Sequence, residues 1–263
     1  MKTVAIICDC DNTLMPDLPS LLLKDNGMEP QDFWDKIDLL VKEGWDPPIA
    51  WMTELVKLIQ DGKIKQNTNE KLAEFSASVA VYTGADTFID KINSKLGTNS
   101  NISVEGYVVS SGIESMMKGS KIANSFTDIF GGRLYEKDGI IAGIKSSITF
   151  TEKTKFIFAI NKGITSKIRE KPYDVNNFIP VEERRIQFEN MIYLGDGPSD
   201  IPCFSMIEKL GGTSIAIDSK DEWSKNWEYE LRSRKMDSFK PDYTPGSSLM
   251  GTIETIVSKL ITE

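Results

Sequence analysis

The chain has 263 residues, 40% hydrophobic and 27% charged, which predicts an ordinary globular protein with one large domain or a core and a smaller satellite domain. The formal net charge of −8 argues against nucleic acid as a partner, although a local pocket can still accept a small phosphorylated molecule. The sequence has no histidine, which excludes histidine metal sites, Ser-His-Asp triads and histidine general bases.

The cysteines and the apolar segments indicate the cellular setting. Cys8, Cys10 and Cys203 are sparse and odd in number, which fits a reducing compartment without a disulfide framework. No stretch reaches the roughly 18–20 apolar residues of a membrane span, and the run Val4 to Cys8 is too short for a secretory signal peptide. We therefore expect a cytoplasmic protein with no membrane partner.

Four short apolar runs predict buried strands. Thr3–Cys8 is largely β-branched, and the runs at 104–110, 191–194 and 213–217 are similar. Each run ends in small or polar residues and is followed by a helical pattern, which predicts an α/β fold with a parallel sheet. Ligands of such sheets bind at the carboxyl ends of the strands, so the residues that follow each run are the functional candidates.

Residues 15–84 interrupt this alternation with a helical pattern. Helices are predicted at about 30–44 and 48–62, and a third begins at Asn67, with Glu70 completing a capping box. The segment holds three of the five tryptophans, Trp34, Trp45 and Trp51. We interpret these tryptophans as packing in a small helical core, with substrate contact as the alternative.

The remaining elements are predicted from local patterns. A helix with an apolar face covers 88–96, and residues 131–135 form a strand that leads into a hairpin turn at 138–139. A short charged helix is expected over 181–189, and an amphipathic helix that packs on the sheet is expected over 248–260.

The first candidate site is Asp9-Cys10-Asp11-Asn12-Thr13, which follows the first predicted strand. Two carboxylates two residues apart are costly there unless a cation offsets their charge. In an extended chain both point the same way, so one can attack phosphorus while the other handles the proton of the leaving group. The alternative is a loop with two acids that cap a helix.

Two further candidates lie where predicted helices begin. Ser110, Ser111 and Gly112 follow a predicted strand, and hydroxyl and backbone N–H groups at a helix N-terminus can hold a phosphate, although serine is also a common N-cap. Lys153 begins another predicted helix and could neutralise phosphate and carboxylate charge. Lys155 is a rival two positions later, and a solvated lysine is the alternative in either case.

The fourth candidate, Gly195-Asp196-Gly197-Pro198-Ser199-Asp200, follows the run at 191–194. Glycines flank Asp196, so the backbone can approach a ligand closely. Asp196 and Asp200 lie four residues apart across a predicted strand-to-helix turn. Hard oxygen ligands of this kind suit Mg²⁺, which binds through one or two carboxylates and substrate phosphate.

These four motifs, in this order, resemble the haloacid dehalogenase superfamily. The family's Asp-x-Asp-x-Thr pattern is similar to residues 9–13, its strand-ending serine to Ser110, its lysine before a helix to Lys153, and its Gly-Asp-Gly-x-x-Asp pattern to 195–200. The helical segment after the first motif resembles the phosphoserine phosphatase branch, which has a helical cap. The resemblance implies a Rossmann-like three-layer core at 1–14 and 85–263 and an all-helical cap domain at 15–84.

The resemblance also implies a role for each site residue. Asp9 would be the nucleophile that forms an aspartyl-phosphate, and Asp11 the general acid and base. Mg²⁺ would be held by Asp9, Asp11 through its carbonyl, Asp196 and Asp200, with Asp200 a ligand or just behind the ligands. The phosphoryl group would contact the Cys10 N–H, Ser110, Ser111 and Lys153.

The implied activity is a Mg²⁺-dependent phosphatase that acts on a small phosphorylated metabolite. An acid at Asp11 favours phosphatase over dehalogenase, while a phosphomutase or phosphotransferase and a non-catalytic phosphate-binding protein remain as alternatives. No arginine precedes Arg133, so the cap lacks the arginine that usually clamps a substrate carboxylate in this branch. The sequence therefore argues against phosphoserine itself as the substrate.

Overall fold

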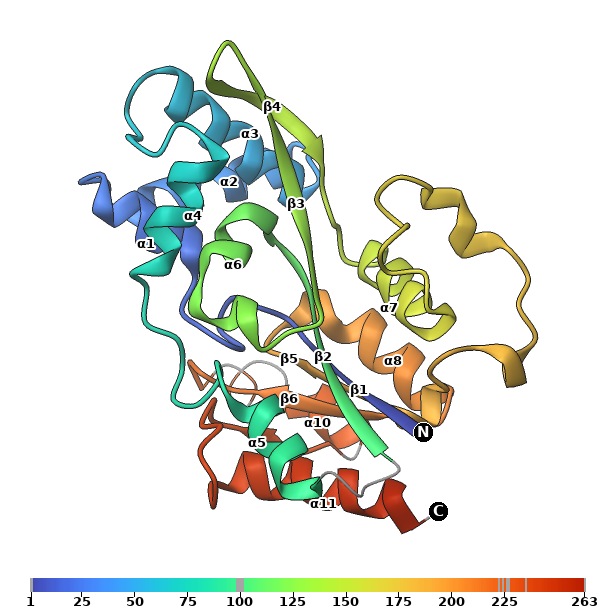
Figure 1. Ribbon diagram of the computed structural model, residues 1–263. Coiled ribbons are helices and arrows are strands. Elements are labelled where there is room, and N and C mark those ends of the chain that lie inside the picture. The colour runs from blue at the N-terminus through green and yellow to red at the C-terminus, as the bar shows by residue number, and fades with distance from the viewer. Residues whose placement is uncertain are drawn as a thin grey trace.

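A mostly parallel sheet forms the centre of the computed structural model, which describes residues 2–97, 102–221, 223, 225, 228–234 and 236–262 (Figure 1). The strand order is β4-β3-β2-β1-β5-β6-β7, and only β4 runs antiparallel to its neighbour among the described strands. The strands are β1 (Lys2–Cys8), β2 (Ile102–Ile113), β3 (Asp128–Lys137), β4 (Ile140–Ser146), β5 (Met191–Gly195), β6 (Thr213–Ile217) and β7 (Ser238–Phe239). The predicted α/β fold is confirmed.

The central strand β1 is buried on both faces. Val4, Ile6 and Cys8 pack into one apolar cluster, and Ala5 and Ile7 pack into another. This alternation follows from the pleat of the strand, because successive side chains point to opposite faces. A continuous apolar run is therefore what a central parallel strand requires.

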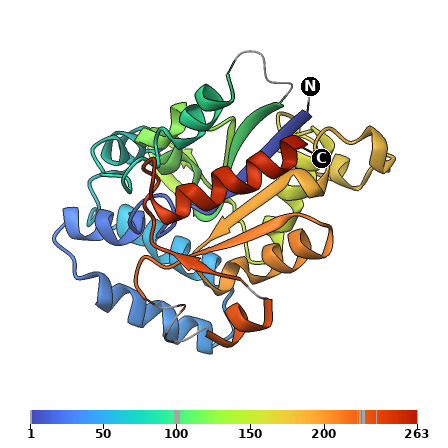
Figure 2. The same ribbon diagram turned by 90° about the horizontal axis from the view of Figure 1, so that it is seen from below.

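Helices cover both faces of the sheet (Figure 2). Helices α5 (Phe88–Leu96) and α11 (Ser248–Thr262) contribute to the cluster on one face, and α7 (Glu152–Lys162) and α8 (Ile201–Lys209) to the cluster on the other. The remaining short elements are α6 (Glu114–Gly119), α10 (Glu228–Arg234) and the 3₁₀ turns η1 (Lys121–Asn124), η2 (Pro172–Asn176), η3 (Val181–Glu183), η4 (Phe188–Asn190) and η5 (Pro198–Asp200). Among the described residues, no helix combines the length and the apolar character that a membrane crossing needs.

The segment between β1 and α5 folds into four helices beyond one end of the sheet (Figure 1). They are α1 (Leu18–Asp25), α2 (Pro30–Lys42), α3 (Pro47–Gln60) and α4 (Asn69–Ala77). The capping prediction at Asn67 was wrong by one residue, because Thr68 is the N-cap and its Oγ1 accepts from the Lys71 N–H at 3.1 Å. The Asn67 carbonyl instead accepts from the Ile141 N–H of β4 at 2.9 Å, which joins the helices to the sheet.

The two chain connections between these helices and the sheet lie side by side. The Tyr82 N–H of the second connection donates to the Leu14 carbonyl of the first at 2.9 Å. Tyr243, which precedes α11 and is fully buried, bonds to both. Its N–H donates to the Thr83 carbonyl at 2.8 Å and its hydroxyl to the Thr13 carbonyl at 2.9 Å.

Two other local predictions had different outcomes. The hairpin between β3 and β4 is confirmed, with Asp138 and Gly139 at φ of 54° and 79° in its turn. The charged helix at 181–189 was wrong, because this stretch forms only the turns η3 and η4. Between them the backbone is extended at Arg184 and Gln187, and the Arg184 side chain bonds to the Ile179 carbonyl at 3.1 Å.

Candidate active site

The adjacent strands β1 and β5 carry the first and fourth motifs to the same edge of the sheet. Cys8 is the register partner of Leu194, and the Asp9 N–H donates to the Leu194 carbonyl at 2.9 Å. Asp9 and Asp196 therefore follow neighbouring strand ends. Here the strand order reverses, with β2 on one side of β1 and β5 on the other, which is where α/β sheets form their ligand crevices.

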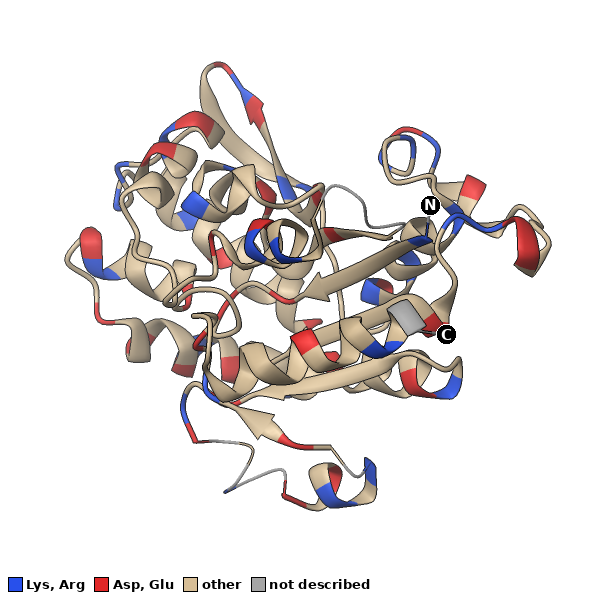
Figure 3. Ribbon diagram, turned by 60° about the horizontal axis from the view of Figure 1, so that its bottom comes forward, with Lys and Arg blue, Asp and Glu red and all other residues tan. Residues whose placement is uncertain are grey.

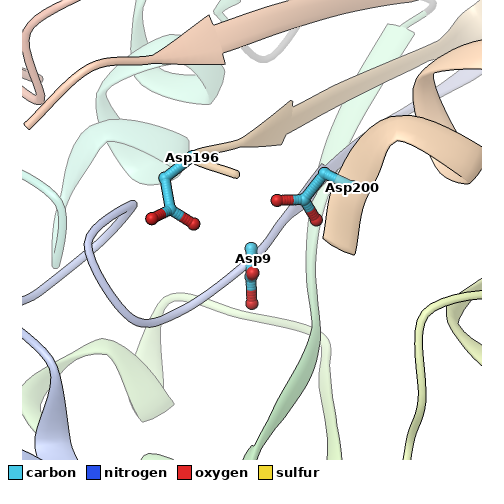
Figure 4. A group of neighbouring side chains, drawn as sticks. All are labelled: Asp9, Asp196 and Asp200. Carbon is cyan, nitrogen blue, oxygen red and sulfur yellow. The ribbon is translucent and has the colours of Figure 1, made fainter. Parts of the chain in front are cut away.

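Three carboxylates converge at this point. Asp9, Asp196 and Asp200 each offer one oxygen, and these three oxygens lie within 4.8 Å of one another. Figure 4 shows the three side chains directed toward a common space, with Asp200 supplied by the turn that leads into α8. Asp9 is 6% exposed and Asp200 is fully buried, so this negative charge is shielded from water.

Lys153 is the cation of the cluster. Its side chain is fully buried, and Nζ lies 2.7 Å from Asp9 Oδ2, 2.7 Å from Asp200 Oδ1 and 3.4 Å from Ser199 Oγ. The rival Lys155 points elsewhere, because its ammonium pairs with Glu152 and lies over the Phe156 ring. Of the two lysines proposed from the sequence, the structure brings Lys153 to the site.

Burial and mutual repulsion shift the pKa values of this cluster. Burial raises the pKa of Asp196 well above its usual range, and the charges of Asp9 and Asp200 raise it further. Burial also raises the pKa of Asp200, although Lys153 opposes this. For Lys153, burial lowers the pKa, but the carboxylates of Asp200 and Asp9 outweigh it, so the ammonium stays charged.

Asp11 lies beside this cluster but is not part of the carboxylate triad. Its Oδ1 accepts from the Leu18 N–H at 3.0 Å. Burial, followed by the charge of Asp17, raises the pKa of Asp11 well above its usual range despite that hydrogen bond. A Cβ on Gly112 would stand 3.0 Å from Asp11 Oδ2, so glycine is what allows this close approach.

Ser110 and Ser111, which were expected to contact phosphate, lie beside Asp9 and Asp196 at the cavity, but their local structure differs from the prediction. Ser110 does not begin a helix, because β2 continues through a bulge to Ile113 and α6 starts only at Glu114. The Ser111 Oγ is buried and has no hydrogen-bond partner among the described residues. The Cys10 side chain packs in the apolar core, and its N–H donates to Asp9 Oδ1 at 2.7 Å.

A cavity of about 210 Å³ opens above these groups. Its lining includes the site residues Asp9, Asp11, Ser110, Ser111 and Asp196. Trp34 and Trp51 form part of its wall while they also pack with the helical core, with ring centroids 6.4 Å apart. Packing in the helical core is therefore confirmed for these two tryptophans, and their place in the cavity wall leaves substrate contact as a prediction, whereas Trp45 is 42% exposed.

The sequence interpretation missed several residues of this site. Asp17 and Pro19 line the cavity, and Asp17 is the N-cap of α1, with Oδ2 accepting from Ser20 Oγ at 2.7 Å. An acid followed two positions later by proline is typical of a helix start and could have revealed this turn. The Tyr193 hydroxyl donates to Asp200 Oδ1 at 2.7 Å, and no local pattern marked it.

The acidic triad fits a hard divalent cation. The Asp200 oxygens accept from Lys153, Tyr193 and the Gly197 N–H, whereas no described residue donates a hydrogen bond to the Asp196 carboxylate. A half-buried carboxylate with a raised pKa and no donor is stabilised by a cation. Oxygen-only ligands in this number suit Mg²⁺ better than a soft metal.

Comparison with known proteins supports the fold assignment. No protein-family model matches the chain. An uncharacterized protein of Borreliella burgdorferi is 28% identical over 280 residues, which covers 95% of each chain. A HAD family hydrolase of Salmonella enterica serovar Typhi has a similar structure with a TM-score of 0.58 and 16% identity, covering 90% of this chain and 67% of that one.

Two further solved structures have the same architecture. A phosphoserine phosphatase in the form of a phospho-aspartyl intermediate analogue matches with a TM-score of 0.54 and 19% identity, covering 97% of this chain and 99% of that one. A cytosolic 5′-nucleotidase IIIB bound to cytidine matches with a TM-score of 0.51 and 17% identity, covering 98% and 86%. The chain therefore has the fold of the haloacid dehalogenase hydrolases and resembles the phosphoserine phosphatases among them.

Proposed function

We propose that the protein is a Mg²⁺-dependent phosphatase that hydrolyses a small phosphorylated metabolite through an aspartyl-phosphate on Asp9. The observation that carries the proposal is the convergence of Asp9, Asp196, Asp200 and Lys153 at one strand edge, beneath a cavity that Asp11 also lines. The structural likeness to a phosphoserine phosphatase with a phospho-aspartyl analogue supports the same chemistry.

In this proposal each side chain has one task. Asp9 Oδ attacks phosphorus, forming an O–P bond as the bond to the leaving alkoxide breaks. Asp11, whose raised pKa keeps a proton available, donates that proton to the alkoxide and afterwards accepts one from the attacking water. The Lys153 ammonium and the Ser110 and Ser111 hydroxyls would hold the phosphoryl oxygens, where charge develops.

The proposed metal site uses Asp9, Asp196 and the Asp11 carbonyl, with Asp200 behind them. When bound, Mg²⁺ supplies positive charge that offsets the phosphoryl and carboxylate oxygens. Asp200 suits an orienting role, because its oxygens already accept from Lys153, Tyr193 and the Gly197 N–H.

We further propose that residues 15–84 act as a cap over a core formed by 1–14 and 85–263. Asp17, Trp34 and Trp51 from this segment line the cavity, where they would meet the leaving group. No described arginine or lysine lines the cavity, and Asp17 adds an acid from the helical segment to the three of the core, so a carboxylate on the leaving group would be repelled. The leaving group is therefore small and lacks a carboxylate.

The three cysteines are free and buried, which supports the proposal of a reducing, cytoplasmic setting.

The test of activity is phosphate release from p-nitrophenyl phosphate and from a panel of phosphorylated metabolites with Mg²⁺. Asp9→Asn should lower kcat by about three orders of magnitude or more. Asp138→Asn is the matched control, because it makes the same change in the hairpin turn at φ 54°, which asparagine tolerates, and it should keep full activity. Full turnover by Asp9→Asn would refute the nucleophile assignment.

Other outcomes decide between the alternatives. Product that appears only with a second sugar phosphate would indicate a phosphomutase or phosphotransferase, and a folded, Mg²⁺-binding but inert protein would indicate a phosphate-binding protein. Within the phosphatase proposal, phosphoethanolamine should exceed O-phosphoserine in kcat/KM by at least about tenfold, because the two differ by one carboxylate. Equal kcat/KM values for the two compounds would refute only the inference that the leaving group lacks a carboxylate, and would leave the proposed phosphatase activity standing.

A further inference from the structure

A second cavity lies away from the candidate active site, on the outer face of α7. Its volume is about 640 Å³, within the roughly 300–1,000 Å³ of small-molecule pockets. Lys155, Phe158 and Lys162 form one wall, since they lie on successive turns of one helix face. The opposite wall comes from the η2 turn and from Arg184, in the segment that projects beyond α7 (Figure 1).

The cavity is positive on an acidic protein. Its lining contains Lys155, Lys162 and Arg184 but no aspartate or glutamate, although the chain has a net charge of −8. Figure 3 shows acidic and basic residues interspersed over most of the molecule, so a one-sign lining is a local departure from the general pattern. Such concave clusters of one sign attract ligands of the opposite sign.

Two of these cations have only neutral partners. Lys162 Nζ donates to the carbonyls of Val175 at 2.6 Å and Asn177 at 2.7 Å. Arg184 donates to the Ile179 carbonyl at 3.1 Å and to Asn161 Oδ1 at 3.3 Å. Neither forms a salt bridge within the described part of the chain, so their positive charges are not compensated.

The neighbouring arginines of the same region differ in this respect. Arg169 pairs with Asp128 and Glu114, and Arg185 pairs with Glu105. Burial lowers the pKa of Lys162, and the nearby charge of Arg184 lowers it further, as expected for two neighbouring cations without an anion between them. An anion between them would remove this repulsion.

Aromatic rings stand beside the cations. Tyr173 is 83% exposed, and its ring is available to stack against a planar group. Phe158, in the α7 wall of the cavity, packs edge-on against Phe188, with ring centroids 5.4 Å apart. The Asn176 amide offers both a donor and an acceptor at the rim.

We infer that this cavity binds an anionic metabolite with a planar ring, of the chemical class of a nucleoside monophosphate. The phosphate lies between Lys162 and Arg184, and the ring stacks on Tyr173 above Phe158. Helix α7, which forms one wall of this cavity, also carries Lys153, which bonds to Asp9 in the candidate active site. A ligand bound in the cavity would therefore contact both the η2 segment and the helix that carries Lys153.

The test is calorimetric titration of AMP into full-length Asp9→Asn protein with Mg²⁺, in which turnover is blocked. Adenosine and inorganic phosphate, the two halves of AMP, are titrated in parallel. AMP should bind at least about tenfold more tightly than either half, since both the cations and the ring contribute. Raising the salt concentration should weaken AMP and leave adenosine unchanged.

Variants locate the binding. Lys162→Gln also removes bonds that hold the 172–184 segment, so Tyr173→Ala and Lys155→Gln are the decisive changes, because neither side chain forms a hydrogen bond or ion pair with that segment in the described structure. Tyr173→Ala should weaken AMP by about fivefold or more, and Lys155→Gln should reduce the dependence on salt. Tyr229→Ala, on α10 and 79% exposed, is the matched control and should bind as the parent does.

The inference is overturned if AMP does not bind at millimolar concentration. It is also overturned if AMP binds equally well to Tyr173→Ala and to its Tyr229→Ala control, since binding then lies elsewhere. These outcomes do not depend on phosphatase activity, so they leave the proposed function to its own test.

Discussion

Replacement of Lys153 by methionine tests the electrostatic account of the candidate active site. The Lys153 Nζ lies 2.7 Å from both Asp9 Oδ2 and Asp200 Oδ1, and the side chain is fully buried. Methionine fills nearly the same volume, so the main loss is the charge that holds two buried carboxylates. Breaking such a buried pair costs about 3–5 kcal/mol of the free energy of unfolding. At roughly 2.1 cal/mol/K per residue over 263 residues, Tm should fall by about 5–9 °C.

The assay is thermal unfolding followed by calorimetry near neutral pH, with EDTA present so that no cation takes the place of the ammonium. Lys155→Met is the matched control two positions away. Its ammonium pairs with Glu152 at a partly exposed site, so the change should cost no more than about 1 kcal/mol. Equal melting temperatures for the two variants would show that Lys153 does not stabilise the carboxylates, and the account of the site would have to be abandoned.

Three further predictions follow from other contacts. Gly195→Ala should destabilise the fold by about 1–3 kcal/mol and lower activity, because the new Cβ would lie 2.3 Å from Asp200 Cγ; parental melting and turnover would contradict this. Mg²⁺ at about 100 times its Kd should stabilise the protein by about 2.7 kcal/mol, and Asp196→Asn should remove most of that shift in a thermal titration. Burial raises the pKa of Glu105, but the hydrogen bonds from Arg185 and Tyr107 and the Arg185 charge together lower it more. The stabilisation from these contacts should therefore be present above the unfolded pKa of about 4.3 and disappear as pH falls through the folded value. Urea titrations should therefore separate Arg185→Gln from the parent by up to about 1 kcal/mol near pH 7 and bring them together below about pH 4.

The strands and the acid motifs were predictable because each has a strong local cause. A central parallel strand must be apolar on both faces, so Thr3–Cys8 could be recognised without its neighbours. The rule that ligands bind at the carboxyl ends of such strands then marked Asp9 and Asp196. The same reasoning could not give the order of the strands, which depends on packing across the whole sheet.

The missed features depend on contacts between distant parts of the chain. Tyr193 reaches Asp200 only because the turn after β5 brings that carboxylate back over the strand. The expected helix at 181–189 is replaced by turns, because Arg185 extends to Glu105 of β2 instead of continuing a helical repeat. Asn67 and Thr68 are both good N-caps, and only pairing of the Asn67 carbonyl with β4 decides between them.

The bonds from Tyr243 have a consequence for motion. The helices at 15–84 are linked to the sheet by two connecting segments, and Tyr243 bonds to both segments through the carbonyls of Thr13 and Thr83. The helices also meet β4 through the bond between Asn67 and Ile141, so a swing of the helices would have to break that bond as well. Tyr243 therefore holds the two connections at one point, although it lies more than 150 residues after them in the sequence. Loss of the Tyr243 side chain would remove its bond to Thr13 while the bond between Tyr82 and Leu14 remains. Under the proposed function, the placement of the helices over the cavity therefore depends in part on a side chain that does not line it.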